Sequence, residues 1–286
     1  MKKKLHIAVQ KSGRLHDESL KLLNDCGISI DNGKDQLKAV ARNFPLEIFY
    51  LRNGDIPQYL RDGVVDIAII GENLLVEKGD DISIKEKLGF SKCRVSIAIP
   101  KEGTYKGIQS LIGKKIATSY PNTVKGFLIE KGIDAELHII NGSVEIAPNI
   151  GLSDAVCDIV SSGSTLFKNN LKEVEVLFKS EAVLAASSTL DAEKNDILKK
   201  LQFRIQSVLK GRQSKYILMN VPNDSIDRIS SILPVLKSPT VLPLAEPGWS
   251  SLHSVINEGK FWEVIDELKA AGAQDILVCP VEKMVL

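Results

Sequence analysis

Apolar residues along this chain form short runs separated by polar loops, and the runs alternate between two spacings. The segments at 5–9 (LHIAV) and 46–52 (LEIFYLR) predict strands. The continuous apolar run at 64–71 (VVDIAIIG) is typical of a strand buried on both faces of a parallel sheet. Residues 16–28 have apolar positions at helical spacing, and residues 55–63 (DIPQYLRDG) predict a short helix with a proline in its first turn. Strands that alternate with helices predict an α/β architecture.

The middle of the chain repeats this plan. Strands are expected at 94–100, 114–119 and 135–142, with a helix at 120–133 that ends at a glycine and a helix and turn at 143–156. Because two similar α/β lobes place a cleft where their strand-end loops converge, we expect a ligand site between them.

One junction occurs in both halves. Residues 66–74 read DIAIIGENL and residues 158–166 read DIVSSGSTL, and the two share Asp, Ile, Gly and Leu at four of nine aligned positions. Each predicts a strand, a loop and the start of a helix. The similarity indicates an internal repeat or a chance match.

From about residue 213 the pattern changes to strand, helix, strand, strand, helix, strand. That order is typical of the ferredoxin-like module, and the stretch 210–215 (KGRQSK) is the expected boundary. We interpret this part as a small ligand-sensing or packing domain. The expected strands are at 214–221, 239–245, 250–257 and 275–284, and the expected helices at 223–233 and 259–273.

Composition excludes several classes of protein. The 286 residues carry a net charge of +1, so no overall field attracts nucleic acid or an acidic membrane. No run approaches the roughly 20 apolar residues of a membrane span, and the basic start MKKK is followed too soon by polar residues for a secretory leader. The four cysteines are scattered without CxxC spacing, so we expect them to be buried thiols in a reducing cytoplasm.

The hydroxyl-rich copy of the junction is the strongest chemical signal. Its loop places several hydroxyls beside a helix N-terminus, where main-chain N–H groups and the helix dipole favour an anion. Gly163 would let the backbone approach a phosphate closely, and Asp158 would accept hydrogen bonds from sugar hydroxyls. The alternative is a strand that ends in a Ser/Thr helix cap. The loop has neither the lysine of a Walker loop nor the glycines of a dinucleotide fingerprint.

Three other loops are weaker candidates. Residues 10–15 (QKSGRL) put two cations beside a glycine, which suits a polyphosphate or simply a solvated loop. Glu72 and Asn73 would read a base or ribose, or else face solvent and cap a helix. Glu145 stands at a capping-box position, a structural role. The histidines are far apart, and no hydrolase triad or zinc motif is present.

Taken in order, QKSGRL, DGVVDIAIIGENL, CRVSIAIP, IATSYP, NGSVEIAP, CDIVSSGSTL, SKYI and SPTVLPLA resemble the ATP phosphoribosyltransferases of the long form, over about Leu5 to Met284. The resemblance implies a two-lobed catalytic region like that of periplasmic binding proteins and a C-terminal ferredoxin-like regulatory domain. It implies transfer of phosphoribosyl from phosphoribosyl pyrophosphate to N1 of ATP with release of pyrophosphate, as the first step of histidine biosynthesis. It also implies Mg²⁺ carried by the substrate, with no protein ligand assigned.

The resemblance further implies which residues act. Asp158 would hold the ribose hydroxyls, and Lys11 and Arg14 would face phosphates and join Asp158 as catalytic residues. The expected phosphoribosyl pyrophosphate site is Asp158, Ser161, Ser162, Gly163, Ser164, Thr165 and Leu166. The expected ATP site is Lys11, Gly13, Arg14, Asp66, Gly71, Glu72 and Asn73. The expected regulatory histidine site is Asn220, Thr240 and Ala273.

The resemblance predicts inhibition by histidine and a homo-oligomer that passes from dimer to hexamer in the cytoplasm, with no nucleic acid or membrane partner. The expected domains are lobe I at 1–92 and 178–212, lobe II at 93–177 and the regulatory domain at 213–286. A different hypothesis is a non-catalytic, two-lobed small-molecule sensor. The two phosphate-binding loops favour the transferase, because a plain amino-acid receptor has no use for them.

Overall fold

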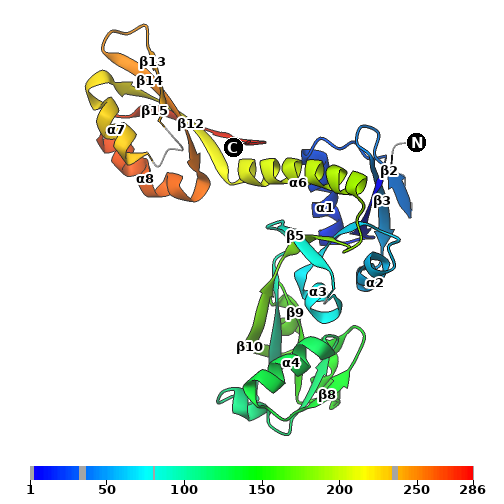
Figure 1. Cartoon of the computed structure of the whole chain (residues 1–286). Helices are drawn as coiled ribbons and strands as arrows, with labels where there is room; N and C mark the ends of the chain where they lie inside the picture. Colours follow the sequence, from blue (N-terminus) through cyan, green and yellow to red (C-terminus); the bar gives the residue numbers. More distant parts are fainter. Residues whose placement is uncertain (1–2, 32–36, 80, 234–237, 286) are drawn as a thin grey trace. The chain divides into compact units, whose positions relative to one another are not determined.

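A computed structural model describes residues 3–31, 37–79, 81–233 and 238–285. The chain divides into two compact units: the first comprises Met1–Asn24 and Ile28–Leu198, and the second comprises Asp25–Gly27 and Lys199–Leu286. Strands of the described residues form a six-stranded and a five-stranded sheet in the first unit and a four-stranded sheet in the second (Figure 1). Each sheet with its helices has its own hydrophobic core.

The first lobe is built on the six-stranded sheet, in the order β2-β3-β1-β4-β11-β5. Strands β1, β3 and β4 run parallel, so their carboxyl ends lie at one edge of the sheet. Strand β4 is buried on both faces, as the continuous apolar run predicts. The elements are β1 (Leu5–Gln10), α1 (Arg14–Asp25), β2 (Lys38–Val40), β3 (Leu46–Leu51), η1 (Asn53–Asp55), α2 (Ile56–Arg61), β4 (Ile67–Gly71), α3 (Glu72–Lys78), β5 (Ser83–Lys87) and β11 (Ala182–Ala186).

The second lobe is built on the five-stranded sheet, in the order β10-β6-β9-β7-β8. Strands β7, β8 and β9 are parallel and again end at one edge. Helix α4 ends at Gly132, whose φ of 65° is the left-handed conformation that favours glycine after a helix. The elements are β6 (Cys93–Pro100), η2 (Ile108–Leu111), β7 (Lys115–Thr118), α4 (Pro121–Lys131), β8 (Glu136–Ile139), η3 (Val144–Ile146), η4 (Pro148–Ile150), β9 (Ala155–Val160), α5 (Ser164–Lys168) and β10 (Leu171–Ser180).

In the second unit the sheet order is β13-β14-β12-β15, which matches the ferredoxin-like arrangement. Helices α7 and α8 cover one face of this sheet (Figure 1), and Ile229 and Leu268 from these helices lie in its core. Helix α6 (Ala192–Arg212) begins in the first unit and ends in the second. The other elements are β12 (Ser214–Pro222), η5 (Asn223–Ser225), α7 (Ile226–Ile232), β13 (Thr240–Pro243), β14 (Trp249–Asn257), α8 (Glu258–Ala270) and β15 (Gln274–Pro280).

Several expected elements differ from the structure. The helix expected at 143–156 is two short 3-10 turns, because Pro148 interrupts the segment and Ser143 has a left-handed φ of 49°. Strand β4 begins three residues later than the apolar run. Strands β10 and β11 and helix α6 are not predicted from the sequence. Helix α7 ends at Ile232, before Pro234, and residues 234–237 lie outside the described ranges. The lobe and domain boundaries stay a prediction.

The four cysteines are free thiols, as expected. Cys26 and Cys157 are buried, whereas Cys93 is half-buried and Cys279 is exposed on the edge strand β15. The prediction that all four are buried is therefore wrong for Cys279.

Candidate active site

A pocket of about 210 Å³ lies at the carboxyl ends of the parallel strands of the second lobe. Loops that follow such strand ends form the ligand crevice of many open α/β sheets. Every residue of the predicted phosphoribosyl pyrophosphate site lines this pocket, and four further residues join it. The lining consists of Glu145, Val156, Asp158, Ile159, Val160, Ser161, Ser162, Gly163, Ser164, Thr165 and Leu166.

Asp158 lies on β9, two residues before the strand ends. Its Oδ1 accepts the Ile159 N–H at 2.8 Å and the Ser119 hydroxyl at 3.3 Å. Burial raises the pKa of Asp158, and the nearby charge of Glu145 raises it further, whereas the two hydrogen bonds lower it. The carboxylate is thus a half-buried acceptor with a fixed orientation. It is suited to hydrogen bonds from neutral hydroxyl groups.

The loop after β9 gathers hydroxyls in front of a helix start. Ser162 Oγ and Ser164 Oγ are 3.0 Å apart, and α5 begins at Ser164. The Ser164 N–H donates weakly to Ser162 Oγ at 3.4 Å, and the next N–H groups of α5 have no carbonyl one turn earlier to bind. This arrangement can hold an anion by main-chain and hydroxyl donors together.

Gly163 meets a backbone requirement of its own, and its expected approach to a phosphate stays a prediction. Its φ is 79°, and a Cβ at this position would meet no atom within 4 Å. The glycine is therefore required by the left-handed backbone at the helix start, because an L side chain is strained there. Close approach to another group of the protein is not the reason.

The QKSGRL loop of the first lobe reaches the pocket. Arg14 Nη1 donates to Ser161 Oγ at 3.1 Å, and Nη2 donates to the carbonyl oxygen of Lys92 at 3.4 Å. Gly13 has a φ of 90°, and α1 begins directly after it. Lys11 is exposed on the same loop. The structure thus brings together the two loops that the sequence singled out, although 147 positions separate Arg14 from Ser161.

Asn73 is not open to a ligand. It is 3% exposed, and its amide donates to the Tyr120 hydroxyl at 2.8 Å and accepts from the Ser180 hydroxyl at 3.0 Å. The prediction that Asn73 reads a nucleotide is therefore not supported. Glu72 forms an ion pair with Lys87 at 3.1 Å.

Gly71 is the residue before α3, and a Cβ there would lie 2.4 Å from Asn73 Oδ1. This glycine is required by close approach. Gly71 and Glu72 remain at the strand-end edge of the first lobe, together with the loop of Arg14.

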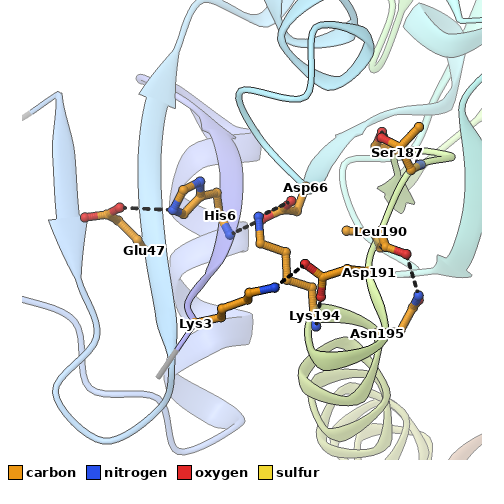
Figure 2. A network of polar contacts seen from close by, with 10 residues as sticks. Lys3, His6, Glu47, Asp66, Ser187, Leu190, Asp191, Lys194 and Asn195 are labelled. Carbon is orange, nitrogen blue, oxygen red and sulfur yellow. Dashed lines mark hydrogen bonds and ion pairs between the residues drawn. The ribbon is translucent and has the colours of Figure 1, made fainter. Parts of the chain in front are cut away.

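Asp66 lies at the other end of β4, away from the ligand edge (Figure 2). Its Oδ2 accepts the His6 N–H at 2.8 Å, and its Oδ1 pairs with Lys194 Nζ at 2.7 Å. The resemblance placed Asp66 in the ATP site, but Asp66 precedes its strand, whereas Asp158 stands near the end of its strand. The two aspartates match in sequence but not in structure.

Four residues of the site were assigned no pocket role from the sequence. Ser119 and Tyr120 follow β7, and Arg94 donates to the Ser161 carbonyl oxygen at 3.2 Å while its guanidinium pairs with Glu173. Glu145 lines the pocket, and the structure contradicts its capping role, because the cap of η3 has no side-chain hydrogen bond. A polar pair directly after a strand, as in Ser119–Tyr120, is the signal that identifies such positions.

The three predicted regulatory residues do not share one face of the second unit's sheet. Asn220 pairs with Ser251 and Thr240 pairs with His253, which places them on the face away from the core. Asn220 donates to Asp275 at 3.0 Å. Ala273 is 6% exposed and packs in the core under the helices.

The described residues have neither a membrane-spanning helix nor a cluster of metal ligands. No helix among them is both long and apolar enough for a membrane crossing. No group of three or more His, Cys, Asp or Glu residues among them is arranged to hold a metal ion.

Comparisons with known proteins agree with this geometry. A family model described as ATP phosphoribosyltransferase matches residues 52–207, and one described as HisG, C-terminal domain, matches residues 211–283. ATP phosphoribosyltransferase from Cytophaga hutchinsonii is 56% identical over 281 residues, 98% of each chain. That from Phocaeicola vulgatus is 51% identical over 282 residues, 99% of this chain and 100% of the relative.

Among solved structures, the ATP phosphoribosyl transferase (HisG:HisZ) complex from Thermotoga maritima matches with a TM-score of 0.59 and 29% identity. The match covers 71% of this chain and 98% of that chain. Together with the sheet orders and the match of the C-terminal domain, this confirms the predicted fold class, two α/β lobes followed by a ferredoxin-like domain.

Proposed function

This chain belongs to the ATP phosphoribosyltransferase family, and we propose that the pocket of Asp158 and Ser161–Leu166 is its phosphoribosyl pyrophosphate site. The family transfers phosphoribosyl from phosphoribosyl pyrophosphate to ATP in the first step of histidine biosynthesis. The observation that carries the site assignment is the 3.1 Å contact between Arg14 and Ser161. It joins the cationic loop of one lobe to the hydroxyl loop of the other.

The ribose and the 5′-phosphate of phosphoribosyl pyrophosphate both have suitable partners in this pocket. The Asp158 carboxylate accepts hydrogen bonds from the ribose hydroxyls. The hydroxyls and N–H groups of Ser161–Leu166 bind the 5′-phosphate. Gly163 gives the loop the backbone turn that points these donors inward.

The ATP site lies at the strand-end edge of the first lobe. Lys11 and Arg14 bind phosphate oxygens, and Gly13 lets the loop turn into α1. Gly71 and Glu72 form the neighbouring wall. Asp66 and Asn73 are left out of this proposal, because both are engaged within the protein.

The chemistry requires alignment and charge stabilisation. Adenine N1 attacks C1′ of the ribose as the bond from C1′ to pyrophosphate breaks, and the transition state has oxocarbenium character. Neutral N1 is already nucleophilic, so no strong base is needed to start the reaction. Holding the two substrates in line supplies several kcal/mol. Arg14 and Lys11 stabilise the charge that develops on the departing pyrophosphate.

A metal ion is required in this family, and we propose Mg²⁺ bound to the pyrophosphate of the substrate. An ion carried by the substrate fits the described residues, because no group of three or more His, Cys, Asp or Glu residues among them is arranged to hold a metal. When bound, Mg²⁺ neutralises charge on the leaving group.

The second unit is proposed to bind histidine as a feedback inhibitor, with Asn220 and Thr240 on the uncovered face of its sheet. Ala273 would contribute through its main chain, since its side chain lies in the core. We propose assembly from dimers to hexamers in the cytoplasm. Histidine must then bind two assembled states unequally in order to inhibit.

The test is an ultraviolet assay of N1 alkylation with ATP, phosphoribosyl pyrophosphate and Mg²⁺, with pyrophosphatase added to pull the reaction forward. We expect Arg14→Ala and Asp158→Asn to lower kcat/KM sharply while the circular dichroism spectrum is unchanged. Arg42→Ala is the control, because Arg42 pairs with Asp31 on the surface outside the site. Full activity of both site variants would refute the assignment. Binding of substrates without turnover would support the sensor hypothesis instead.

A further inference from the structure

The segment Thr118–Thr123 runs from the last residue of β7 into the first turn of α4, and it connects the pocket of the second lobe to helix α3 of the first. On its pocket side, the Ser119 hydroxyl donates to Asp158 Oδ1. Thr118 is fully buried, and its hydroxyl accepts the Tyr120 N–H at 2.9 Å. The conformation of this segment therefore sets where the Ser119 hydroxyl points.

Glu77 of α3 supplies the N-terminal cap of α4 from the other lobe. The residue before α4 is Tyr120, which has no capping side chain. Glu77 is 4% exposed, and its carboxylate accepts the N–H groups of Asn122 and Thr123 at 3.0 and 2.9 Å. It also accepts the Thr123 hydroxyl at 2.8 Å. These are the N–H groups that a helix start leaves without a partner, and a carboxylate there interacts favourably with the helix dipole.

Asn73 of the same helix holds the other side of the segment. Its amide nitrogen donates to the Tyr120 hydroxyl, and its oxygen accepts from Ser180 at the end of β10. Tyr120 is 7% exposed. Burial raises the pKa of the Tyr120 phenol, and the charge of Asp158 raises it further.

We infer that Glu77 and Asn73 are positioning residues for the proposed pocket: they hold the segment Thr118–Thr123, whose Ser119 hydroxyl orients Asp158. This inference rests on the proposed function of Asp158. Helix α3 of the first lobe thus fixes the orientation of Asp158, which lines the pocket of the second lobe. Neither residue touches the substrate in this arrangement, and each acts through the segment.

The test is the pH dependence of kcat/KM for phosphoribosyl pyrophosphate on the acid side. The Ser119 hydroxyl favours the ionised form of Asp158, so its loss raises the pKa of Asp158 and moves the acid limb to higher pH. The charge of Glu145 also raises the pKa of Asp158, and the charge of Asp158 raises the pKa of Tyr120; Glu145 and Tyr120 are unchanged in Ser119→Ala and Glu77→Gln. We expect Ser119→Ala and Glu77→Gln to move the limb in the same direction.

The double variant Ser119→Ala/Glu77→Gln should move the limb no further than Ser119→Ala alone. Glu77→Gln should lower kcat/KM by at least about 10-fold, since a misplacement of about 1 Å costs on the order of 100-fold. Asp154→Asn is the matched control. Asp154 also accepts a main-chain N–H of the second lobe, from Lys115 at 2.9 Å, but at the far end of β7. Its acid limb should match that of the wild type.

Tyr120→Phe covers the case in which Glu77→Gln fails to fold, because it removes only the hydroxyl that Asn73 holds. It should move the acid limb as Ser119→Ala does. An unchanged limb in Glu77→Gln and Tyr120→Phe, with Asp158→Asn inactive, would overturn this inference and leave the proposed site standing. A fully active Asp158→Asn enzyme would overturn the proposed site itself.

Discussion

The ion pair between Asp66 and Lys194 makes a sharp prediction about stability, because a second ion pair of the same type lies beside it (Figure 2). Lys194 Nζ is 2.7 Å from Asp66 Oδ1, and the two side chains are 22% and 9% exposed. Lys3 Nζ is 2.9 Å from Asp191, and those side chains are 52% and 45% exposed. The distances are alike, and the burial differs.

Lys194→Met removes the ion pair and leaves the Asp66 carboxylate buried. The carboxylate still accepts the His6 N–H. Breaking a buried pair costs about 3–5 kcal/mol of folding free energy. The partial exposure of Lys194 and the remaining hydrogen bond reduce this, so we expect a loss of about 2–3 kcal/mol. Lys3→Met should cause no measurable change, because water screens that pair.

The assay is urea unfolding followed by far-ultraviolet circular dichroism. A loss of about 2–3 kcal/mol corresponds to a midpoint shift of about 1 M urea. Both tryptophans, Trp249 and Trp262, lie in the second unit, so tryptophan fluorescence provides an internal control that should not move.

The double variant Asp66→Asn/Lys194→Met removes both charges, and it should recover most of the lost stability because no unpaired buried charge remains. Equal midpoints for Lys194→Met and Lys3→Met would refute the reasoning. So would a double variant that recovers nothing.

Three further outcomes are expected. Gly163→Ala should cost about 1–2 kcal/mol in the same assay, since a side chain is strained at its φ of 79°, whereas Gly126→Ala, at an exposed position inside α4, should stabilise by about 0.5–1 kcal/mol. Asp158→Asn should raise the unfolding midpoint at neutral pH while activity is lost. The native pKa of Asp158 is raised, so the native state holds the proton more tightly than the unfolded chain does. Ionisation of Asp158 at neutral pH therefore opposes folding, and the neutral Asn side chain removes this cost. Hydrogen bonds from Arg94 lower the pKa of Glu173 below its ordinary value of 4.5. The stability that ionised Glu173 contributes is therefore present above pH 4.5 and lost as the pH falls through the lower native pKa. Glu173→Gln should remove this part of the acid destabilisation when unfolding midpoints are measured against pH.

Local sequence signals predicted the fold where a pattern has one structural solution. The apolar run of β4 and the glycine after α4 belong to this class. Helix α6 was missed although Leu198, Leu201, Ile205 and Val208 are buried at helical spacing, because charged residues between them mask the stripe.

The lining of the pocket was predicted where its residues lie in one contiguous loop, as in Ser161–Leu166. It was not predicted where contacts join distant segments. Asn73 has the residue type of a nucleotide ligand, but Tyr120 and Ser180 satisfy its amide, and only the packing of the two lobes shows this. The ATP-site prediction for Asp66 failed for a related reason: its position before β4 and its pair with Lys194 follow from the fold and not from a local motif.

The position of β11 has a consequence for synthesis on the ribosome. This fully buried strand pairs with β4 on one side and β5 on the other, yet it follows the whole second lobe in sequence. Until residue 186 leaves the exit tunnel, β4 has an open edge, and β5 lacks the partner it has in the finished sheet. The second lobe is contiguous from β6 to β10, so it can complete its sheet first. The first lobe to be translated is therefore the second to close, and nascent chains expose an apolar strand edge during the interval.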